Sequence, residues 1–115
     1  FIVNDKFGTP TYTYDFAKNT KKLIETESYG LFNMVCGGLT SRADVTKRLI
    51  EILELQNSIV INEVDSKYFN KEYFASRPDC ERLINKNLDD LKLNIMRDWD
   101  VSLKEYIDNY YHDYL

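Results

Sequence analysis

Two short patterns in the sequence carry side chains that could do chemistry, and the first joins a phenol to an ammonium. Tyr14 and Lys18 are four residues apart, so on a helix both would lie on one face, where the ammonium can lower the pKa of the phenol for proton transfer. The chain holds 9 tyrosines and 10 lysines among 115 residues, so this spacing arises readily by chance. We interpret Tyr14 as a packing residue and expect no catalytic residue in this chain.

The second pattern is an arginine in a stiffened loop. A proline follows Arg77 and restricts its backbone, and Tyr73 and Phe74 precede it closely. A guanidinium held in this way can clamp a phosphate through two parallel hydrogen bonds while an aromatic ring stacks on a base or sugar. A plain surface ion pair of Arg77 with Asp79 or Glu81 explains the same pattern equally well.

Several other kinds of site are excluded by composition. His112 is the only histidine, so a zinc site or a Ser-His-Asp or Cys-His arrangement would depend on this one residue near the chain end. Cys36 and Cys80 are 44 residues apart, and we expect both thiols to be reduced. Glycine occurs only at positions 8, 30, 37 and 38, so neither a G-x-G-x-x-G fingerprint nor a phosphate loop can be written. We therefore expect no metal and no nucleotide cofactor bound by this chain.

The charge argues against nucleic acid as a partner. The 19 acidic and 15 basic residues give a net charge of −4, whereas a sequence-independent nucleic-acid binder needs a basic surface. Residues 1–88 hold 12 acids and 12 bases, so the net charge comes from residues 89–115, with 7 acids and 3 bases. Those acids alternate with apolar residues, which indicates the solvated face of a helix.

The length and the hydrophobic pattern bound the organisation of the chain. A length of 115 residues without a linker or repeat predicts one domain over residues 1–115. No apolar run is long enough to cross a membrane and no secretory signal is visible, so we expect no membrane partner and a cytoplasmic location. The chain begins with Phe1 in place of methionine, which indicates a part of a longer protein.

Strands and helices are predicted to alternate in a small α/β fold. Short apolar runs predict about three strands, at 1–3, 31–36 and 58–64. Helical periodicity predicts helices from 13 to about 27, from 41 to 53, within 83–93 and from 98 to 110. The order β-α-β-α-β-coil-α favours parallel strands joined by right-handed crossovers.

Capping residues and apolar stripes refine three of these helices. Thr13 and Asp98 are predicted N-caps, and Ser41 with Asp44 resembles a capping box. The stripes predicted to face the core are Phe16, Thr20, Leu23 and Ile24 in the first helix, Val45, Leu49, Ile52 and Leu53 in the second, and Trp99, Leu103, Tyr106, Ile107 and Tyr110 in the last.

Three segments, in order, resemble a known family. The segment VNDKFGTPTYTYDFA (3–17) resembles the V-x-D-Q-x-G-x-P-T-Y-x-x-D-L-A segment of dTDP-4-dehydrorhamnose reductases. GLFNMV (30–35) resembles their G-I-Y-H-V strand. Arg77-Pro78, followed by Leu83, Leu88, RDW (97–99) and SLKEY (102–106), resembles their R-P … L-D-x-x-K-L … D-W-x-x-A-L-x-E-Y-L ending. The similarity covers nearly the whole chain.

The resemblance implies the C-terminal, substrate-binding part of an NAD(P)-binding, Rossmann-like extended short-chain reductase. The parent would reduce a 4-keto-6-deoxy-sugar nucleotide with NAD(P)H in rhamnose biosynthesis, and its own N-terminal Rossmann domain would carry the cofactor loop and the catalytic Tyr-x-x-x-Lys. For the nucleoside-diphosphate sugar, we expect Arg77 at the pyrophosphate, Tyr73 or Phe74 near the base, and the loop Gly8, Thr9, Pro10 and Thr11 as a cleft wall or its support. By itself the chain is expected to be inactive.

The sequence departs from the family pattern at three positions. Lys6 replaces the usual Gln, Ile84 stands in place of Asp, and Asn87 in place of Lys. These changes leave open a UDP-sugar instead of a dTDP-sugar, and an epimerase-reductase instead of a plain reductase. The sequence is also compatible with a noncatalytic regulatory module of the same fold, or with an acidic adaptor that uses the last helix. The sequence also does not decide whether the parent uses NADH or NADPH, whether it forms a homodimer, or whether it requires a metal.

Overall fold

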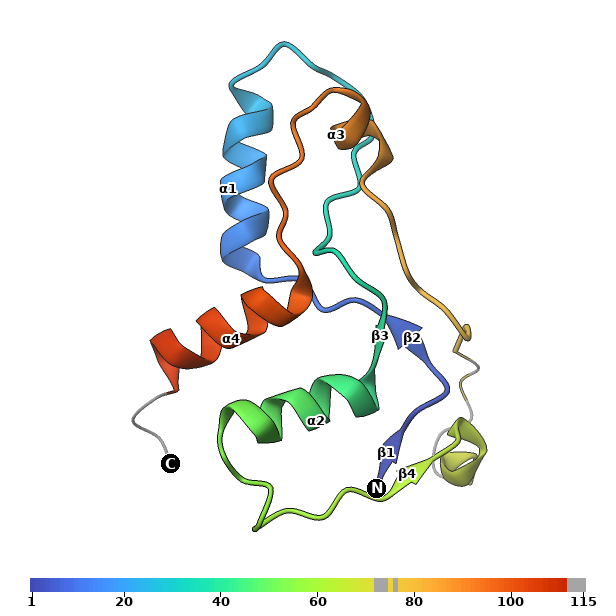
Figure 1. The fold of residues 1–115 in the computed structure, drawn as a ribbon. Helices are drawn as coiled ribbons and strands as arrows, with labels where there is room; N and C mark the ends of the chain where they lie inside the picture. The colour runs from blue at the N-terminus through green and yellow to red at the C-terminus, as the bar shows by residue number, and fades with distance from the viewer. Residues whose placement is uncertain (72–74, 76, 112–115) are drawn as a thin grey trace.

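The computed structural model describes residues 1–71, 75 and 77–111, which form helices joined by irregular segments with a few very short strands (Figure 1). In chain order the elements are β1 (Ile2–Val3), β2 (Phe7–Gly8), α1 (Thr13–Ile24), β3 (Thr40–Ser41), α2 (Arg42–Ile52), β4 (Glu63–Val64), the 3-10 helix η1 (Ser66–Phe69), α3 (Lys86–Asp90) and α4 (Trp99–Tyr110). The predicted α/β class is confirmed.

The strands form two separate pairs. β1 is parallel to β4, with Ile2 opposite Glu63, and β2 is antiparallel to β3, with Phe7 opposite Ser41. α2 packs against β1, β3 and α4. The first and last predicted strands therefore pair in parallel as expected, although the last is shorter than predicted. It keeps only Glu63–Val64, because the chain before it is exposed to solvent, with Val60 85% exposed.

The predicted strand at 31–36 is wrong, because a side-chain amide takes the place of a neighbouring strand. Asn85 Oδ1 accepts a hydrogen bond from the Val35 N–H at 2.9 Å, and Asn85 Nδ2 donates to the Val35 carbonyl at 2.7 Å. The segment still buries Met34 and Cys36, as its apolar pattern requires. Both backbone groups of Val35 are satisfied without a ladder, and no strand forms there.

A second asparagine supports the chain between α3 and α4 in the same way. Asn19 of α1 is fully buried. Its Nδ2 donates to the Leu93 carbonyl at 3.0 Å, and its Oδ1 accepts from the Ile95 N–H at 2.8 Å. A polar residue of α1 therefore holds an irregular segment against the helix.

The buried face of α1 differs from the predicted one. Asp15 and Asn19 are its buried residues, whereas Phe16 and Ile24 of the predicted stripe are 47% and 74% exposed. The helix also ends at Ile24, before the predicted Glu27. The prediction failed because the inward face of α1 makes hydrogen bonds to irregular chain, which needs polar side chains.

Two of the three predicted helix caps are confirmed. Ser41 Oγ accepts from the Asp44 N–H at 3.1 Å and Asp44 accepts from the Ser41 N–H at 3.3 Å, which is a complete capping box. Asp98 caps α4. Thr13 is not a cap, because the N-cap position of α1 belongs to Tyr12, whose side chain makes no capping hydrogen bond.

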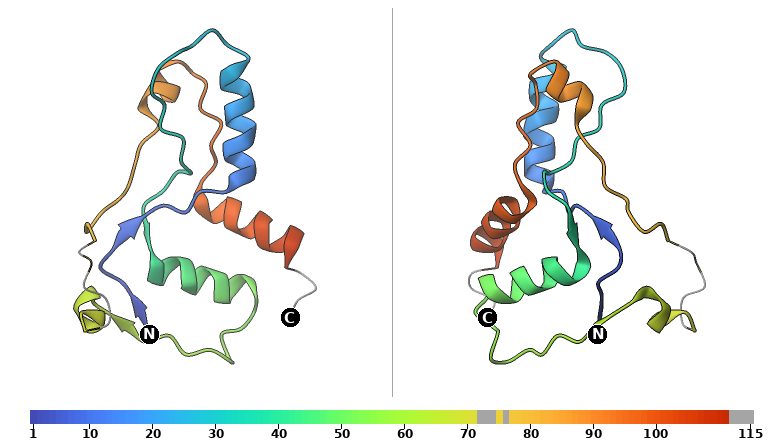
Figure 2. Two further views of the ribbon diagram at one scale, coloured as in Figure 1. Left: turned by 180° about the vertical axis from the view of Figure 1, so that it is seen from behind. Right: turned by 45° about the vertical axis from the view of Figure 1, so that its right-hand side comes forward.

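The described molecule is flat and open. Its radius of gyration is 16.8 Å and its extents are 49 × 37 × 18 Å, whereas a compact domain of this length has a radius of gyration of about 13 Å. Two further views show α1 and α3 at one end and α2 with the β1–β4 pair at the other (Figure 2). Among the described residues, the helices are too short or too polar for any to cross a bilayer.

Replacement of Asn85 by alanine should destabilise the fold. The change leaves both backbone groups of Val35 without their partner, and we expect a loss of about 2 kcal/mol in the free energy of unfolding, measured by urea denaturation. Asn33→Ala is the matched control, because the exposed Asn33 makes one long hydrogen bond of 3.3 Å to the Ile84 carbonyl. Equal losses for the two variants would contradict the role assigned to Asn85.

Candidate functional site

The loop Gly8–Thr11 leaves β2 and is attached to a glycine turn by two threonine side chains. Thr9 Oγ1 donates to the Gly38 carbonyl, and Thr11 Oγ1 accepts from the Cys36 N–H at 3.3 Å. Gly8 pairs with Thr40 of β3. The loop is therefore fixed at its start and along its length, as a wall or support of a binding site requires.

The glycine turn itself packs against the start of α4. Gly38 has a φ of +90°, and a Cβ atom there would lie 2.7 Å from Trp99 Cδ1 and 2.9 Å from an Asp98 carboxylate oxygen. Only glycine fits this position. The Gly37 N–H donates to the Arg97 carbonyl at 2.9 Å, and the Trp99 N–H donates back to the Gly37 carbonyl at 3.1 Å.

The segment that carries Arg77 lies beside the strand that leads into the loop. The Phe7 N–H donates to the Asp79 carbonyl at 2.9 Å, and the Glu81 N–H donates to the Phe7 carbonyl at 2.9 Å. Phe7 and Cys80 thus form a parallel bridge. The structure therefore brings Arg77 and the loop Gly8–Thr11, 66 or more residues apart in sequence, onto neighbouring backbone segments.

The side chain of Arg77 is exposed and makes no ion pair with any described residue. Asp79, one of its two possible partners, is bound by Lys6 Nζ at 2.7 Å instead. A cation without a protein counter-ion can bind an anionic ligand such as a phosphate. Tyr73 and Phe74, expected near the base, lie outside the described residues.

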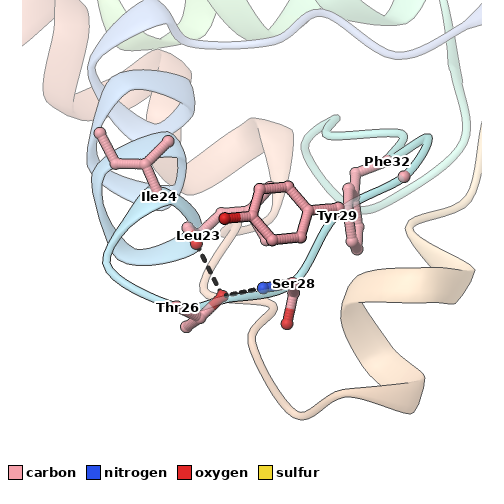
Figure 3. A pocket seen from close by; sticks show the side chains of 7 residues that line it. Leu23, Ile24, Thr26, Ser28, Tyr29 and Phe32 are labelled. Carbon is pink, nitrogen blue, oxygen red and sulfur yellow. Dashed lines mark hydrogen bonds between the residues drawn. The ribbon is translucent and has the colours of Figure 1, made fainter.

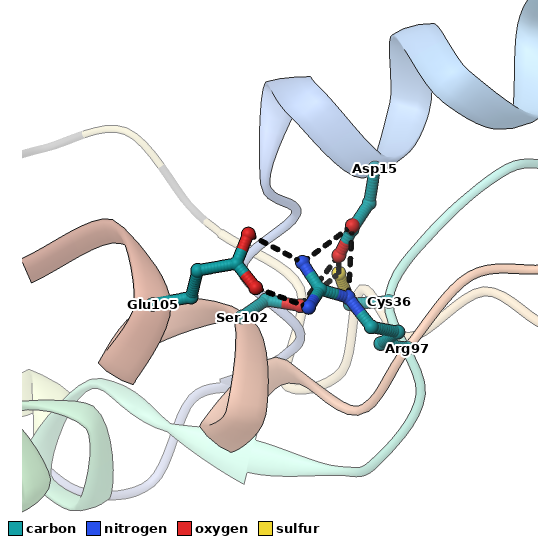
Figure 4. A network of polar contacts seen from close by, with 5 residues as sticks. All are labelled: Asp15, Cys36, Arg97, Ser102 and Glu105. Carbon is teal, nitrogen blue, oxygen red and sulfur yellow. Dashed lines mark hydrogen bonds and ion pairs between the residues drawn. The ribbon is translucent and has the colours of Figure 1, made fainter. Parts of the chain in front are cut away.

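A buried polar network that the sequence analysis did not assign lies between α1 and α4 (Figure 4). Asp15 is 3% exposed. Its Oδ1 accepts from Arg97 Nη2 at 2.7 Å and Nε at 3.0 Å, and its Oδ2 accepts from Ser102 Oγ at 2.6 Å. Arg97 also binds Glu105 with two nitrogens, and Cys36 Sγ lies 3.7 Å from Ser102 Oγ.

The members of this network satisfy one another, so we assign the network to stability and not to chemistry. The hydrogen bonds that Arg97 donates to Glu105 and then to Asp15 hold the pKa of its guanidinium above the ordinary value. The hydrogen bond from Arg97 lowers the pKa of Glu105 below its usual range. Asp15 and Arg97 both lie in segments that resemble the reductase family. This resemblance is the one sequence signal that could have indicated a contact between them.

The Tyr14 and Lys18 pattern does not form a site. Both side chains are exposed, and no hydrogen bond joins them within the described chain. The ring of Tyr14 contacts that of Tyr12, with centroids 5.8 Å apart.

A small pocket of about 270 Å³ opens at the other end of α1 (Figure 3). Its lining includes Leu23, Ile24, Tyr29 and Phe32, and the Thr26 hydroxyl donates to the Leu23 carbonyl at 2.7 Å. The described residues that line it include no charged side chain, so they offer no cation to pair with a phosphate.

Metal ligands do not gather in the part of the chain that the structure describes. No group of three or more His, Cys, Asp or Glu side chains there could hold a metal ion. Cys36 is buried, Cys80 is exposed, and both are free thiols.

Comparison with known proteins adds independent findings. The family model of the RmlD substrate binding domain matches residues 1–112. A search of curated proteins found no match. A dTDP-4-dehydrorhamnose reductase from Clostridium acetobutylicum is 32% identical, with a TM-score of 0.86 over 94% of this chain and 37% of its own.

Two further reductases of that name share the fold. The enzyme from Bacillus anthracis, solved in complex with NADP, is 23% identical with a TM-score of 0.85, over 94% of this chain and 37% of its own. The Yersinia enterocolitica enzyme is 21% identical with a TM-score of 0.81, over 95% and 37%. The chain thus spans 37% of the length of each of these three structures.

Removal of the buried carboxylate should destabilise the whole fold. Asp15→Ala removes the carboxylate partner of Arg97 Nε and of the Ser102 hydroxyl, and we expect a loss of about 2–4 kcal/mol in the free energy of unfolding, measured by urea denaturation. The control is Asp108→Ala, which removes an exposed ion pair of 2.5 Å with Lys104 and should cost less than about 0.5 kcal/mol. If Asp15→Ala unfolded at the same urea concentration as the control, the network would not hold the fold together.

Proposed function

Since the chain belongs to the RmlD substrate binding domain family, we propose that it forms the substrate-binding part of a dTDP-4-dehydrorhamnose reductase-like enzyme. The parent enzyme reduces the 4-keto group of a 6-deoxy-sugar nucleotide with NAD(P)H. The ligand of this chain is the nucleoside-diphosphate sugar. The three solved reductases that share the fold support this proposal.

One observation carries the proposal most directly: the segment of an exposed arginine, which makes no ion pair with any described residue, runs beside the strand that leads into the loop Gly8–Thr11. Arg77 is brought next to β2 by the Phe7–Cys80 bridge, and the loop Gly8–Thr11 continues from the same strand. Each phosphate of a pyrophosphate offers a pair of oxygens that a planar guanidinium can bind with two parallel hydrogen bonds. The loop then supplies the wall against which the sugar or nucleoside lies.

The described residues do not fit a dinucleotide cofactor. A pyrophosphate binds where free N–H groups at a helix N-terminus follow a glycine-rich turn. The N-termini of α2 and α4 are instead capped by side chains of this chain, Ser41 with Asp44 and Asp98, and Tyr12 precedes α1 with no glycine beside it. We therefore assign the cofactor and the hydride-transfer step to the parent's N-terminal Rossmann domain.

The exposed apolar surface supports such a second part. Large apolar side chains that compact domains bury are open to solvent here, among them Tyr29, Leu31 and Ile24 at 91%, 82% and 74% exposed. Exposed apolar patches of this kind mark contact surfaces. We propose that they pack against the Rossmann domain of the same protein, which also explains the flat shape of the chain.

Replacement of Arg77 should weaken nucleotide binding. Arg77→Ala removes the charge-assisted hydrogen bonds to the pyrophosphate, and we expect the Kd for dTDP, measured by calorimetry in the complete protein, to rise about 10-fold to 100-fold. Arg82→Ala is the matched control, because Arg82 is an exposed arginine on the same segment. A parallel titration with UDP tests the base preference. Unchanged binding of dTDP and UDP by Arg77→Ala would refute the assignment of Arg77.

The 115-residue chain alone should transfer no hydride. It is expected to leave NADPH unoxidised in the presence of a 4-keto-6-deoxy-sugar nucleotide, as followed by absorbance, because the proposal assigns the cofactor site and the catalytic Tyr-x-x-x-Lys pair to the Rossmann domain. The positive control is the complete protein, which should oxidise NADPH with the same substrate. Turnover by the isolated chain would disprove the division of labour proposed here.

A further inference from the structure

Lys6 connects the two segments of the proposed site through a pair of hydrogen bonds. Its Nζ donates to the Arg77 carbonyl at 2.9 Å and to the Asp79 carboxylate at 2.7 Å. The Lys6 side chain is only 23% exposed, whereas that of Asp79 is 93% exposed. Lys6 immediately precedes β2, so it ties the Arg77 segment to the strand that continues into the loop Gly8–Thr11.

The contact with Asp79 also affects the charge next to Arg77. Asp79 is two residues from Arg77, and an unpaired carboxylate there could bind the guanidinium and would repel a phosphate. Lys6 forms an ion pair with that carboxylate, and no described carboxylate forms an ion pair with Arg77. The lysine therefore removes a competitor for the arginine and, through the carbonyl, fixes the backbone from which the arginine extends.

We propose that Lys6 is a positioning residue for nucleoside-diphosphate binding: it sequesters Asp79 and anchors the Arg77 backbone, so that the Arg77 guanidinium stays free for the pyrophosphate. This inference rests on the proposed function, because it assigns Lys6 a role at the same site. Lys6 acts through Asp79 and Arg77 and does not itself contact the ligand.

A set of charge variants tests the proposal in the complete protein, with dTDP as the probe and calorimetry as the measurement. Lys6→Met frees Asp79 and should raise the Kd for dTDP about 3-fold to 10-fold. Asp79→Asn alone should bind dTDP at least as tightly as the unchanged protein. The double variant Lys6→Met with Asp79→Asn should bind more tightly than Lys6→Met, because the competing carboxylate is gone. It should bind up to about twofold more weakly than Asp79→Asn, because the hydrogen bond to the Arg77 carbonyl is lost.

Recovery of binding in the double variant separates a positioning role of Lys6 from a purely structural role. If Lys6 served packing alone, or touched the ligand, the double variant would bind as weakly as Lys6→Met or more weakly, and the proposal would be overturned. Unchanged binding by Lys6→Met would overturn it as well. If Lys6→Met does not fold, Lys6→Gln replaces it with the same expectations, because glutamine keeps a donor for the Arg77 carbonyl but has no charge for Asp79.

Two further variants complete the set. Lys86→Met removes the same charge from an exposed lysine that pairs with Asp90 at 2.5 Å on α3, and it should leave the Kd unchanged. A weakening equal to that of Lys6→Met would show that the effect comes from net charge and would overturn the proposal. Arg77→Ala separates the two hypotheses. Normal binding by Arg77→Ala defeats the assignment of Arg77 to the pyrophosphate in the proposed function, whereas weak binding by Arg77→Ala with normal binding by Lys6→Met defeats only the role of Lys6.

Discussion

The buried carboxylate of Asp15 is the interaction on which the arrangement of the chain depends. It receives hydrogen bonds from Arg97, which precedes α4, and from Ser102 within α4, while Cys36 lies against the same group. Burial of a charge is costly unless it is paired and fully hydrogen-bonded, and here both carboxylate oxygens have donors. Because the donors come from residues 82 and 87 positions away, the carboxylate can be satisfied only when α1 and α4 are in place together.

Polar side chains replace a continuous sheet elsewhere in the fold too. Asn85 and Asn19 each satisfy both backbone groups offered by an irregular segment. Sequence patterns detect strands through apolar alternation and helices through apolar periodicity, so they found α2 and α4 with their caps but placed a strand at 31–36. A side-chain amide that acts as a strand partner leaves no periodic signal, because it depends on where one asparagine lies in three dimensions.

In the candidate site, too, sequence patterns indicate some features and miss others. Arg77 and the loop Gly8–Thr11 could be proposed from residue types, a proline and the family resemblance. The contact of Lys6 with the Arg77 segment could not, since the two are 71 positions apart and come together because their segments pair at the Phe7–Cys80 bridge. The prediction that the apolar stripe of α1 faces the core was wrong, because periodicity does not tell what covers an apolar face. Phe16 and Ile24 point away from the described core.

The loop Gly8–Thr11 and the buried network are parts of one connected structure. Thr9 and Thr11 attach the loop to the turn at Cys36–Gly38, and that turn exchanges backbone hydrogen bonds with Arg97 and Trp99. Arg97 in turn is bound by Asp15, and Asp15 lies three residues after the N-cap of α1. The loop therefore lies between two attachments, the Arg77 segment on one side and the Arg97 segment on the other. A loop fixed on both sides loses little conformational entropy when a ligand binds, which favours affinity without additional contacts.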